Sequence, residues 1–197
     1  TTQAAPTEQP TPEPDPVQQL LEEMTLEQKV GQLFLVRPDS LDLSQTQDQI
    51  NDAKADGVTE LTDAMRQTLA EYPVGGVVIF GKNLESPQQI TQFLDDLQQA
   101  SDTPLFAAID EEGGLVARLA NNAAFDLPQY ESAAAVGTSG NPEDARAMGR
   151  TIGGYLKEYG FNLDFAPVAD VNTNPDNPVI GTRAFSSEPQ TAADLVG

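Results

Sequence analysis

Short apolar runs of strand length recur along the chain, and longer segments with helical periodicity separate them. Three of these runs are mostly apolar throughout, which is typical of strands buried on both faces of a parallel sheet. They are GGVVIFG at 75–81, PLFAAID at 104–110 and NLDFAPV at 162–168. An earlier run, LFLV at 33–36, ends where Arg37 and Pro38 prevent a simple continuation of a strand.

Helix-start signals occupy the segments between these runs. Each places a capping side chain close to a proline or ahead of a glutamine. They are DPVQ at 15–18, TLEQ at 25–28, SPQQ at 86–89, NPED at 141–144 and SEP at 187–189. The start at 86–89 precedes an apolar helix face formed by Ile90, Phe93, Leu94 and Leu97. The start at 141–144 predicts a helix to about Tyr159, and Gly160 is placed to end it.

Apolar strands that alternate with capped helices predict an α/β fold in which helices cover a parallel sheet. The Gln- and Asp-rich segment 40–72 is predicted to add one or two surface helices. Functional side chains of such folds collect at the carboxyl ends of the strands, whether the sheet is open or closed. Three consecutive acids at 110–112 occupy such an end, and Asp170, Asn172 and Asn174 follow the next strand.

Composition excludes several classes of partner but says less about the fold. The chain has 197 residues, a net charge of -21 and only 10 lysines and arginines, which argues against nucleic acid or an anionic membrane surface as a partner. No apolar run approaches the roughly 20 residues of a membrane span, so no membrane-spanning segment is expected. The length suits one sizeable core or part of a larger single domain.

Cysteine and histidine are both absent from the sequence. Their absence excludes disulfides, thiolate metal sites, thiol nucleophiles and serine hydrolysis of the familiar kind. The sequence also lacks a phosphate-binding GxxxxGK[ST] loop and a dinucleotide fingerprint, so no cofactor is predicted. Paired carboxylates are the remaining catalytic chemistry, and they point to sugars as the substrate class.

The first sixteen residues, TTQAAPTEQPTPEPDP, have a composition that cannot build a core and favours extended chain. We interpret residues 1–16 as a disordered tether and 17–197 as the folded portion. Such tethers often join an exported domain to a removed signal or a lipid anchor, which favours an extracellular or cell-surface location. The alternative is a disordered tail of an intracellular protein.

The acids after the second apolar run are the first candidate site. Alternate residues from 106 to 110 share one face, so Asp110 projects into the mouth of a barrel if that face lines one. The glycine pair at 113–114 allows a tight turn and the close approach of a ligand, and Arg118 is near enough in the chain to return to the same mouth. The alternative is that Asp110 and Glu111 cap a helical turn and pair with Arg118.

The second candidate is the segment 164–185, DFAPVADVNTNPDNPVIGTRAF, whose Asp, Asn, Pro and Gly residues predict a rigid irregular loop. Arg183 is its only cation. By spacing alone, Arg183 either binds a ligand or satisfies backbone carbonyls or Asp176. Clustered Asp and Asn oxygens also suit calcium, although their spacing does not match an EF-hand loop, and no metal site is predicted.

These motifs resemble glycoside hydrolase family 3, and within it the bacterial β-N-acetylhexosaminidase branch. The resemblance rests on IDEEGG followed by VARL at 109–119 and on GFNLDFAPVADVNTNPDNPVIGTRAFSSEP at 160–189. MTLEQKVGQLF at 24–34 and GGVVIFGKN at 75–83 are similar to the family too. The similarity extends from about residue 21 to the last residue and leaves out the tether and 40–72.

The resemblance implies a (β/α)8 TIM-type barrel, of which this chain covers the N-terminal part. It implies an enzyme that removes terminal N-acetylglucosamine with retention of configuration, so the expected partner is a glycan containing N-acetylglucosamine. By the family pattern, Asp110 holds sugar hydroxyls, Arg118 assists it and Arg183 contacts the sugar. The same pattern implies no cofactor and no metal.

The sequence also departs from the family pattern. Members continue with a Lys-His-Phe-Pro-Gly-His segment, a mobile loop with an Asp-His acid/base pair and an aspartate nucleophile, none of which this sequence contains. The resemblance therefore implies the substrate-binding N-terminal part of a longer enzyme, inactive alone, with no catalytic residue of its own. Two alternatives stay open: a complete sugar-binding or assembly module without catalysis, and a family 3 β-glucosidase.

Overall fold

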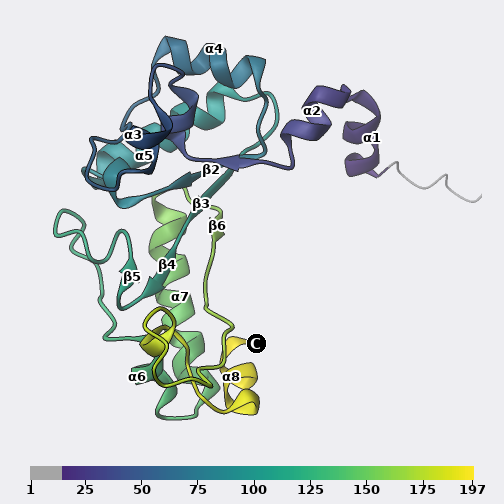
Figure 1. Ribbon diagram of the computed structural model, residues 1–197. Coiled ribbons are helices and arrows are strands. Elements are labelled where there is room, and N and C mark those ends of the chain that lie inside the picture. The colour runs from purple at the N-terminus through teal and green to yellow at the C-terminus, as the bar shows by residue number, and fades with distance from the viewer. Residues whose placement is uncertain (1–14) are drawn as a thin grey trace, which may run out of the picture.

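The computed structural model describes residues 15–197, which form a parallel sheet with helices packed on it (Figure 1). Residues 1–14, most of the predicted tether, lie outside the described residues. The last two tether residues belong to the first helix, because Asp15 caps it and Pro16 is its first residue. Between residues 15 and 197, no helix combines the length and the apolar character that crossing a membrane requires.

The sheet has four parallel strands in the order β1-β2-β3-β6, as the alternation of strands and helices predicts. The central pair, β2 and β3, is in register from Gly76 opposite Phe106 to Ile79 opposite Ile109. The outer strands β1 and β6 pair over two residues each. The strands are β1 (Leu35–Val36), β2 (Gly76–Ile79), β3 (Phe106–Ile109) and β6 (Leu163–Asp164).

The predicted helix starts are confirmed, since Asp15, Thr25, Ser86 and Asn141 each cap a helix with their side chains. Segment 40–72 holds two helices, as predicted. The helices are α1 (Pro16–Glu23), α2 (Leu26–Gly31), α3 (Gln47–Asn51), α4 (Asp63–Glu71), α5 (Pro87–Ala100), α6 (Ala133–Gly137), α7 (Pro142–Glu158) and α8 (Pro189–Val196). Three short 3-10 turns are η1 (Pro38–Leu41), η2 (Gly81–Asn83) and η3 (Gly181–Arg183).

A small antiparallel hairpin directly follows β3, and the apolar pattern gives no signal for it. Its strands are β4 (Glu111–Gly113) and β5 (Val116–Ala117). The turn depends on Gly113 and Gly114, whose φ angles of 83° and 69° are favourable only for glycine. This hairpin carries the chain from Asp110 back to Arg118.

The core lies on one face of the sheet. Leu105, Ala107 and Ile109 of the β3 segment are buried there, and the predicted apolar face of α5 packs in the same core. Burying each of its Leu, Ile and Phe side chains contributes about 1.5–3 kcal/mol. On the other face, Phe106 is 52% exposed. The helix-covered face therefore stabilises the strands, and the opposite face is the one that leads to Asp110.

Candidate functional site

The three consecutive acids at 110–112 each bind a different partner. Asp110 directly follows β3, and its Oδ2 accepts a hydrogen bond from Nη2 of Arg118 at 3.3 Å. Both side chains stay about one third exposed, at 30% for Asp110 and 33% for Arg118. Nε of Arg118 is buried without a hydrogen-bond partner among the described residues. The hairpin thus returns Arg118 to Asp110, and the pair retains a face open to solvent.

Glu111 points the other way and is fully buried. Its carboxylate accepts the backbone N–H groups of Leu119 and Ala120 at 2.9 Å each, and the Tyr155 hydroxyl of α7 at 2.9 Å. Burial, then the charge and hydrogen bond of Glu111, raise the pKa of Tyr155 above its ordinary value. Because Leu119 follows Arg118 directly, Glu111 fixes the backbone that carries this arginine.

The side chain of Glu112 lies on the same side as that of Asp110. It binds Arg183 of η3, which is 71 residues later in the sequence. Nε and Nη2 of Arg183 donate to the two carboxylate oxygens at 2.8 and 2.6 Å, a bidentate pair. The hydrogen bond with Glu112 raises the pKa of Arg183, against the lowering effect of burial; the charges of Glu112, Asp110 and Asp170 raise it further. Glu112 therefore brings Arg183 to the segment that carries Asp110.

A fourth carboxylate completes this group. Oδ1 of Asp164, at the end of β6, accepts the backbone N–H of Glu111 at 3.0 Å. Burial raises the pKa of Asp164 to about 6, opposed by this hydrogen bond and assisted by the charges of Glu111, Asp110 and Glu112. Sequence reasoning missed Asp164 because it stands inside an apolar run that was predicted to continue as a strand to residue 168, whereas β6 ends at Asp164.

Phe80, just after β2, connects Arg118 with the preceding loop. The guanidinium carbon of Arg118 lies 5.7 Å from the centre of the Phe80 ring, and that of Arg37 lies 4.5 Å from it. Arg37 in turn donates to the Ile50 carbonyl at 2.8 Å. The ring therefore supports the same arginine that binds Asp110.

A buried polar network holds the loops after β1 and β2 together. Asp39 accepts from Lys82 Nζ at 3.2 Å through Oδ1 and from Asn83 Nδ2 at 3.0 Å through Oδ2. All three side chains are largely inaccessible to solvent. The backbone N–H of Val58 and the carbonyl of Ile50 join the network, so segment 40–72 is tied to the sheet. Sequence reasoning did not single out these residues.

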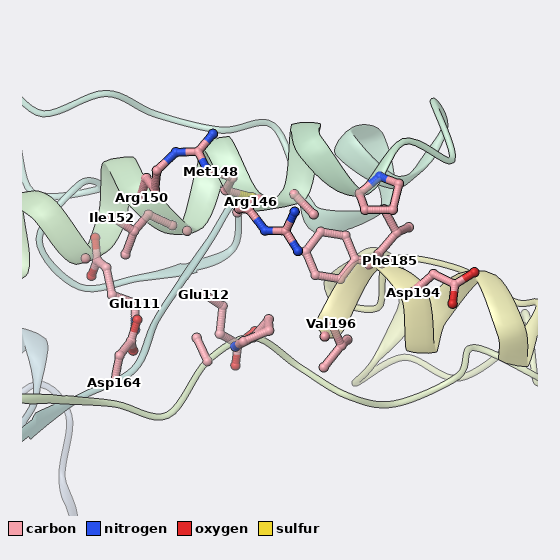
Figure 2. A pocket seen from close by; sticks show the side chains of 18 residues that line it. Glu111, Glu112, Arg146, Met148, Arg150, Ile152, Asp164, Phe185, Asp194 and Val196 are labelled. Atoms are coloured by element: carbon pink, nitrogen blue, oxygen red, sulfur yellow. The ribbon is translucent and has the colours of Figure 1, made fainter.

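A cavity of about 470 Å³ lies beside this group and not at its centre. Figure 2 shows Glu111, Glu112 and Asp164 toward one end and Phe185 and Val196 toward the other. None of Asp110, Arg118 and Arg183 lines it. Glu112 joins the two regions, because it lines the cavity and also binds Arg183.

The predicted residues are thus brought to one end of the sheet through two ion pairs. Asp110 and Arg118 form one pair, as the structural alternative predicts for this arginine. Arg183 pairs with Glu112 and not with Asp176, and its Nη1 also donates to the Val179 carbonyl at 3.4 Å. Within residues 15–197 no group of three or more acids is arranged to hold a metal ion. That these three residues bind sugar stays a prediction.

Comparison with known proteins supports the resemblance to glycoside hydrolase family 3 along most of the chain. A family model described as the glycosyl hydrolase family 3 N terminal domain matches residues 25–197, and the match runs through segment 40–72. Beta-hexosaminidase A of Pseudoalteromonas piscicida is 36% identical over 143 residues, which are 70% of this chain and 24% of that protein. The beta-hexosaminidase of Nitrosomonas eutropha is 35% identical over 141 residues, 70% of this chain and 40% of that protein.

Solved structures agree. A glycoside hydrolase family 3 β-N-acetylglucosaminidase from Paenibacillus superposes with a TM-score of 0.72 at 34% identity, over 88% of this chain and 30% of that one. NagZ from Neisseria gonorrhoeae, in complex with N-trifluoroacetyl-D-glucosamine, gives 0.62 at 26% identity, over 71% and 42%. These similarities confirm the predicted fold class, the N-terminal part of a barrel domain. The chain spans between a quarter and two fifths of the two curated relatives.

Proposed function

Because the chain belongs to glycoside hydrolase family 3, through the N-terminal domain of that family, we propose that the protein hydrolyses terminal β-linked N-acetylglucosamine. The observation that carries this proposal is the match over residues 25–197 together with relatives named beta-hexosaminidase. The proposed substrates are cell-wall or chitin-derived sugars. The proposed reaction is retaining: a carboxylate forms a covalent glycosyl intermediate, an acid protonates the leaving oxygen, and water releases the sugar.

In this proposal the described residues position the sugar and do not break the bond. Asp110 accepts hydrogen bonds from ring hydroxyls, while Arg118 and Arg183 donate to sugar oxygens through the N–H groups that their partners leave free. The partial exposure of Asp110 and Arg118 supports this role, because a ligand can reach both. Fixing the ring in a reactive orientation lowers the barrier by restricting the reactants before the chemical step.

The test of this function uses the enzyme expressed from the full open reading frame. Release of nitrophenol from the β-N-acetylglucosaminide, with little release from the β-glucoside, is the expected result. Cleavage of the glucoside with similar efficiency would favour a β-glucosidase. Binding of N-acetylglucosamine without any cleavage would favour a non-catalytic sugar-binding module.

A second experiment tests the assigned residues. Asp110→Asn and Arg118→Met should each lower kcat/KM by about 10- to 150-fold, because a lost hydrogen bond to a charged group is worth about 1.5–3 kcal/mol. Arg66→Met is the matched control, since Arg66 pairs with Asp96 at 3.8 Å elsewhere on the surface. Wild-type kinetics in the Asp110 and Arg118 variants would remove them from the site.

We also propose that the protein works outside the cytoplasm, at the cell surface or beyond it. The support is compositional: a Pro- and Thr-rich segment opens the sequence, as in tethers of exported domains. Fractionation of cells that express the full gene, followed by assay of each fraction with the nitrophenyl substrate, tests this. Activity confined to the cytoplasmic fraction would contradict export.

A further inference from the structure

Glu112 and Arg183 form the closer of the two ion pairs at the candidate site. Their shortest contact is 2.6 Å, against 3.3 Å for Asp110 and Arg118. The Glu112 side chain is only 5% exposed, and a carboxylate buried this deeply requires a partner that compensates its charge. Two parallel N–H···O bonds also fix the plane of a guanidinium. Glu112 therefore sets both the charge balance and the orientation of Arg183.

The pairing with Glu112 leaves some N–H groups of the Arg183 guanidinium free to bind a ligand. A guanidinium has five N–H groups. Nε–H and one Nη2–H go to Glu112, and one Nη1–H goes to the Val179 carbonyl. One N–H on Nη1 and one on Nη2 remain, and the Arg183 side chain is 24% exposed. Arg183 can thus donate hydrogen bonds even though its charge is already compensated.

Among the described residues, further carboxylates lie beside the two pairs, and the two arginines of the adjoining cavity, Arg146 and Arg150, pair with Glu143. Arg118 is compensated by Asp110, and Asp164 and Glu111 lie close to both pairs. With all side chains ionised, the four carboxylates and two guanidinium groups of this cluster carry a net charge of -2, and only Asp110 and Glu112 pair with the guanidinium groups. Like charges at such distances repel strongly inside a partly buried site. This arrangement offers hydrogen-bond donors to a ligand but no spare positive charge.

We propose that Glu112 is a specificity-determining residue that restricts this site to uncharged sugars. It compensates Arg183, so that this arginine recognises hydroxyl or carbonyl oxygens and does not attract sulfated, phosphorylated or carboxylated rings. The inference rests on the proposed function, because it takes Arg183 to contact the sugar. It adds a role for a residue whose own contacts, within the described part of the chain, are with protein groups.

The test is a binding measurement on the full-length enzyme, separate from hydrolysis. Two analogues of N-acetylglucosamine are compared by calorimetry at low ionic strength: the 6-sulfate and the 6-methanesulfonate. They are similar in size and differ in charge. The wild-type enzyme should bind the neutral ester at least about tenfold more tightly than the sulfate. Equal affinities for the two would overturn the proposal without any variant.

Two variants assign that preference to Glu112. Glu112→Gln removes the charge at nearly constant shape, so the affinity for the neutral ester should fall about tenfold and the preference over the sulfate should drop to about threefold or less. Glu112→Asp keeps the charge with a shorter reach, so affinity should fall while the preference stays. Glu143→Gln is the matched control, because Glu143 pairs with Arg146 and is 62% exposed.

The outcomes separate this inference from the proposed function. Equal weakening of both esters in Glu112→Gln, with an unchanged ratio, would give Glu112 a merely structural role and overturn the inference. So would loss of the preference in Glu112→Asp or in Glu143→Gln. Sugar binding with the expected ratios but no cleavage of the nitrophenyl substrate would refute only the hydrolase. Absence of binding to either ester in the wild-type enzyme would refute sugar recognition itself, and the inference with it.

Discussion

At the scale of single residues, alternation along a strand assigns different roles to neighbouring acids. Asp110 and Glu112 face the candidate site and pair with arginines, while Glu111 between them is buried and binds two backbone N–H groups and Tyr155. We could predict from the sequence that Asp110 and Arg118 lie near one another, because the end of the apolar strand and the glycine pair of the turn can both be recognised in it. It could not reveal that Arg183 meets Glu112, since no periodicity connects residues 71 positions apart.

Asp164 makes stability depend on pH. Its pKa is raised from 3.8 to about 6, so its contribution to stability is fully present below the unfolded value and is lost as pH rises through about 6. Asp164→Asn should therefore increase the free energy of unfolding at pH 7, and by less at pH 4. After allowance for solvent screening of this partly buried group, the gain at pH 7 is about 1–2 kcal/mol.

Urea unfolding of both proteins at pH 4 and pH 7 measures this difference. The Asn side chain can still accept the Glu111 N–H through its amide oxygen, so the wild-type hydrogen bond does not have to be lost. A variant that is less stable than the wild type at pH 7, or equally shifted at both pH values, would contradict the assignment.

At the scale of elements, strands and helices followed from the sequence and the hairpin did not. Caps at Asp15, Thr25, Ser86 and Asn141 are local hydrogen bonds, so the residues that make them can be read directly. The hairpin β4–β5 pairs Glu111 with Ala117 and Gly113 with Val116 over a very short length, so neither strand shows a strand-like alternation of apolar and polar residues. Glycine spacing marked the turn but not the strands around it.

The turn gives a matched pair of glycine substitutions. Gly114→Ala places a Cβ atom 2.9 Å from the Glu131 carbonyl oxygen and the Ser132 Cα, in a backbone with φ of 69°. Gly140 has a similar φ of 62° with nothing within 4 Å, so Gly140→Ala adds only backbone strain. We expect a loss of about 1 kcal/mol for Gly140→Ala and of about 2–4 kcal/mol for Gly114→Ala.

Thermal unfolding of the two variants beside the wild type provides the comparison. Gly114→Ala should also raise KM, because the turn returns Arg118 to Asp110, whereas Gly140→Ala should leave KM unchanged. Equal stability of the two variants would show that backbone strain, and not the close approach to residues 131–132, limits this turn.

At the scale of the whole molecule, the site depends on residues at or after the ends of all four parallel strands, which meet at one end of the sheet. The network of Asp39, Lys82 and Asn83 joins the loops after β1 and β2, and Phe80 links them to Arg118 after β3. The fold class was predictable because alternating strands and helices leave few topologies. Contacts between loops were not, because they depend on distances that only the assembled sheet sets.

Breaking this network should cost much more than breaking a surface pair. Lys82→Met leaves Asp39 buried with one hydrogen bond fewer and no cation, which should lower the free energy of unfolding by about 3–5 kcal/mol. Arg66→Met removes an exposed pair and should cost less than about 1 kcal/mol. Denaturant unfolding measures both, and similar losses in the two variants would show that segment 40–72 is held by other contacts.

The buried side chain of Glu111 also constrains the length of the hairpin. Its carboxylate accepts hydrogen bonds from the N–H groups of residues 119 and 120. These bonds fix the position of the backbone next to Arg118, so they also fix the number of residues between Asp110 and Arg118. An insertion or deletion anywhere in 113–117 would shift which peptide groups reach that carboxylate and would turn the arginine away from its acid.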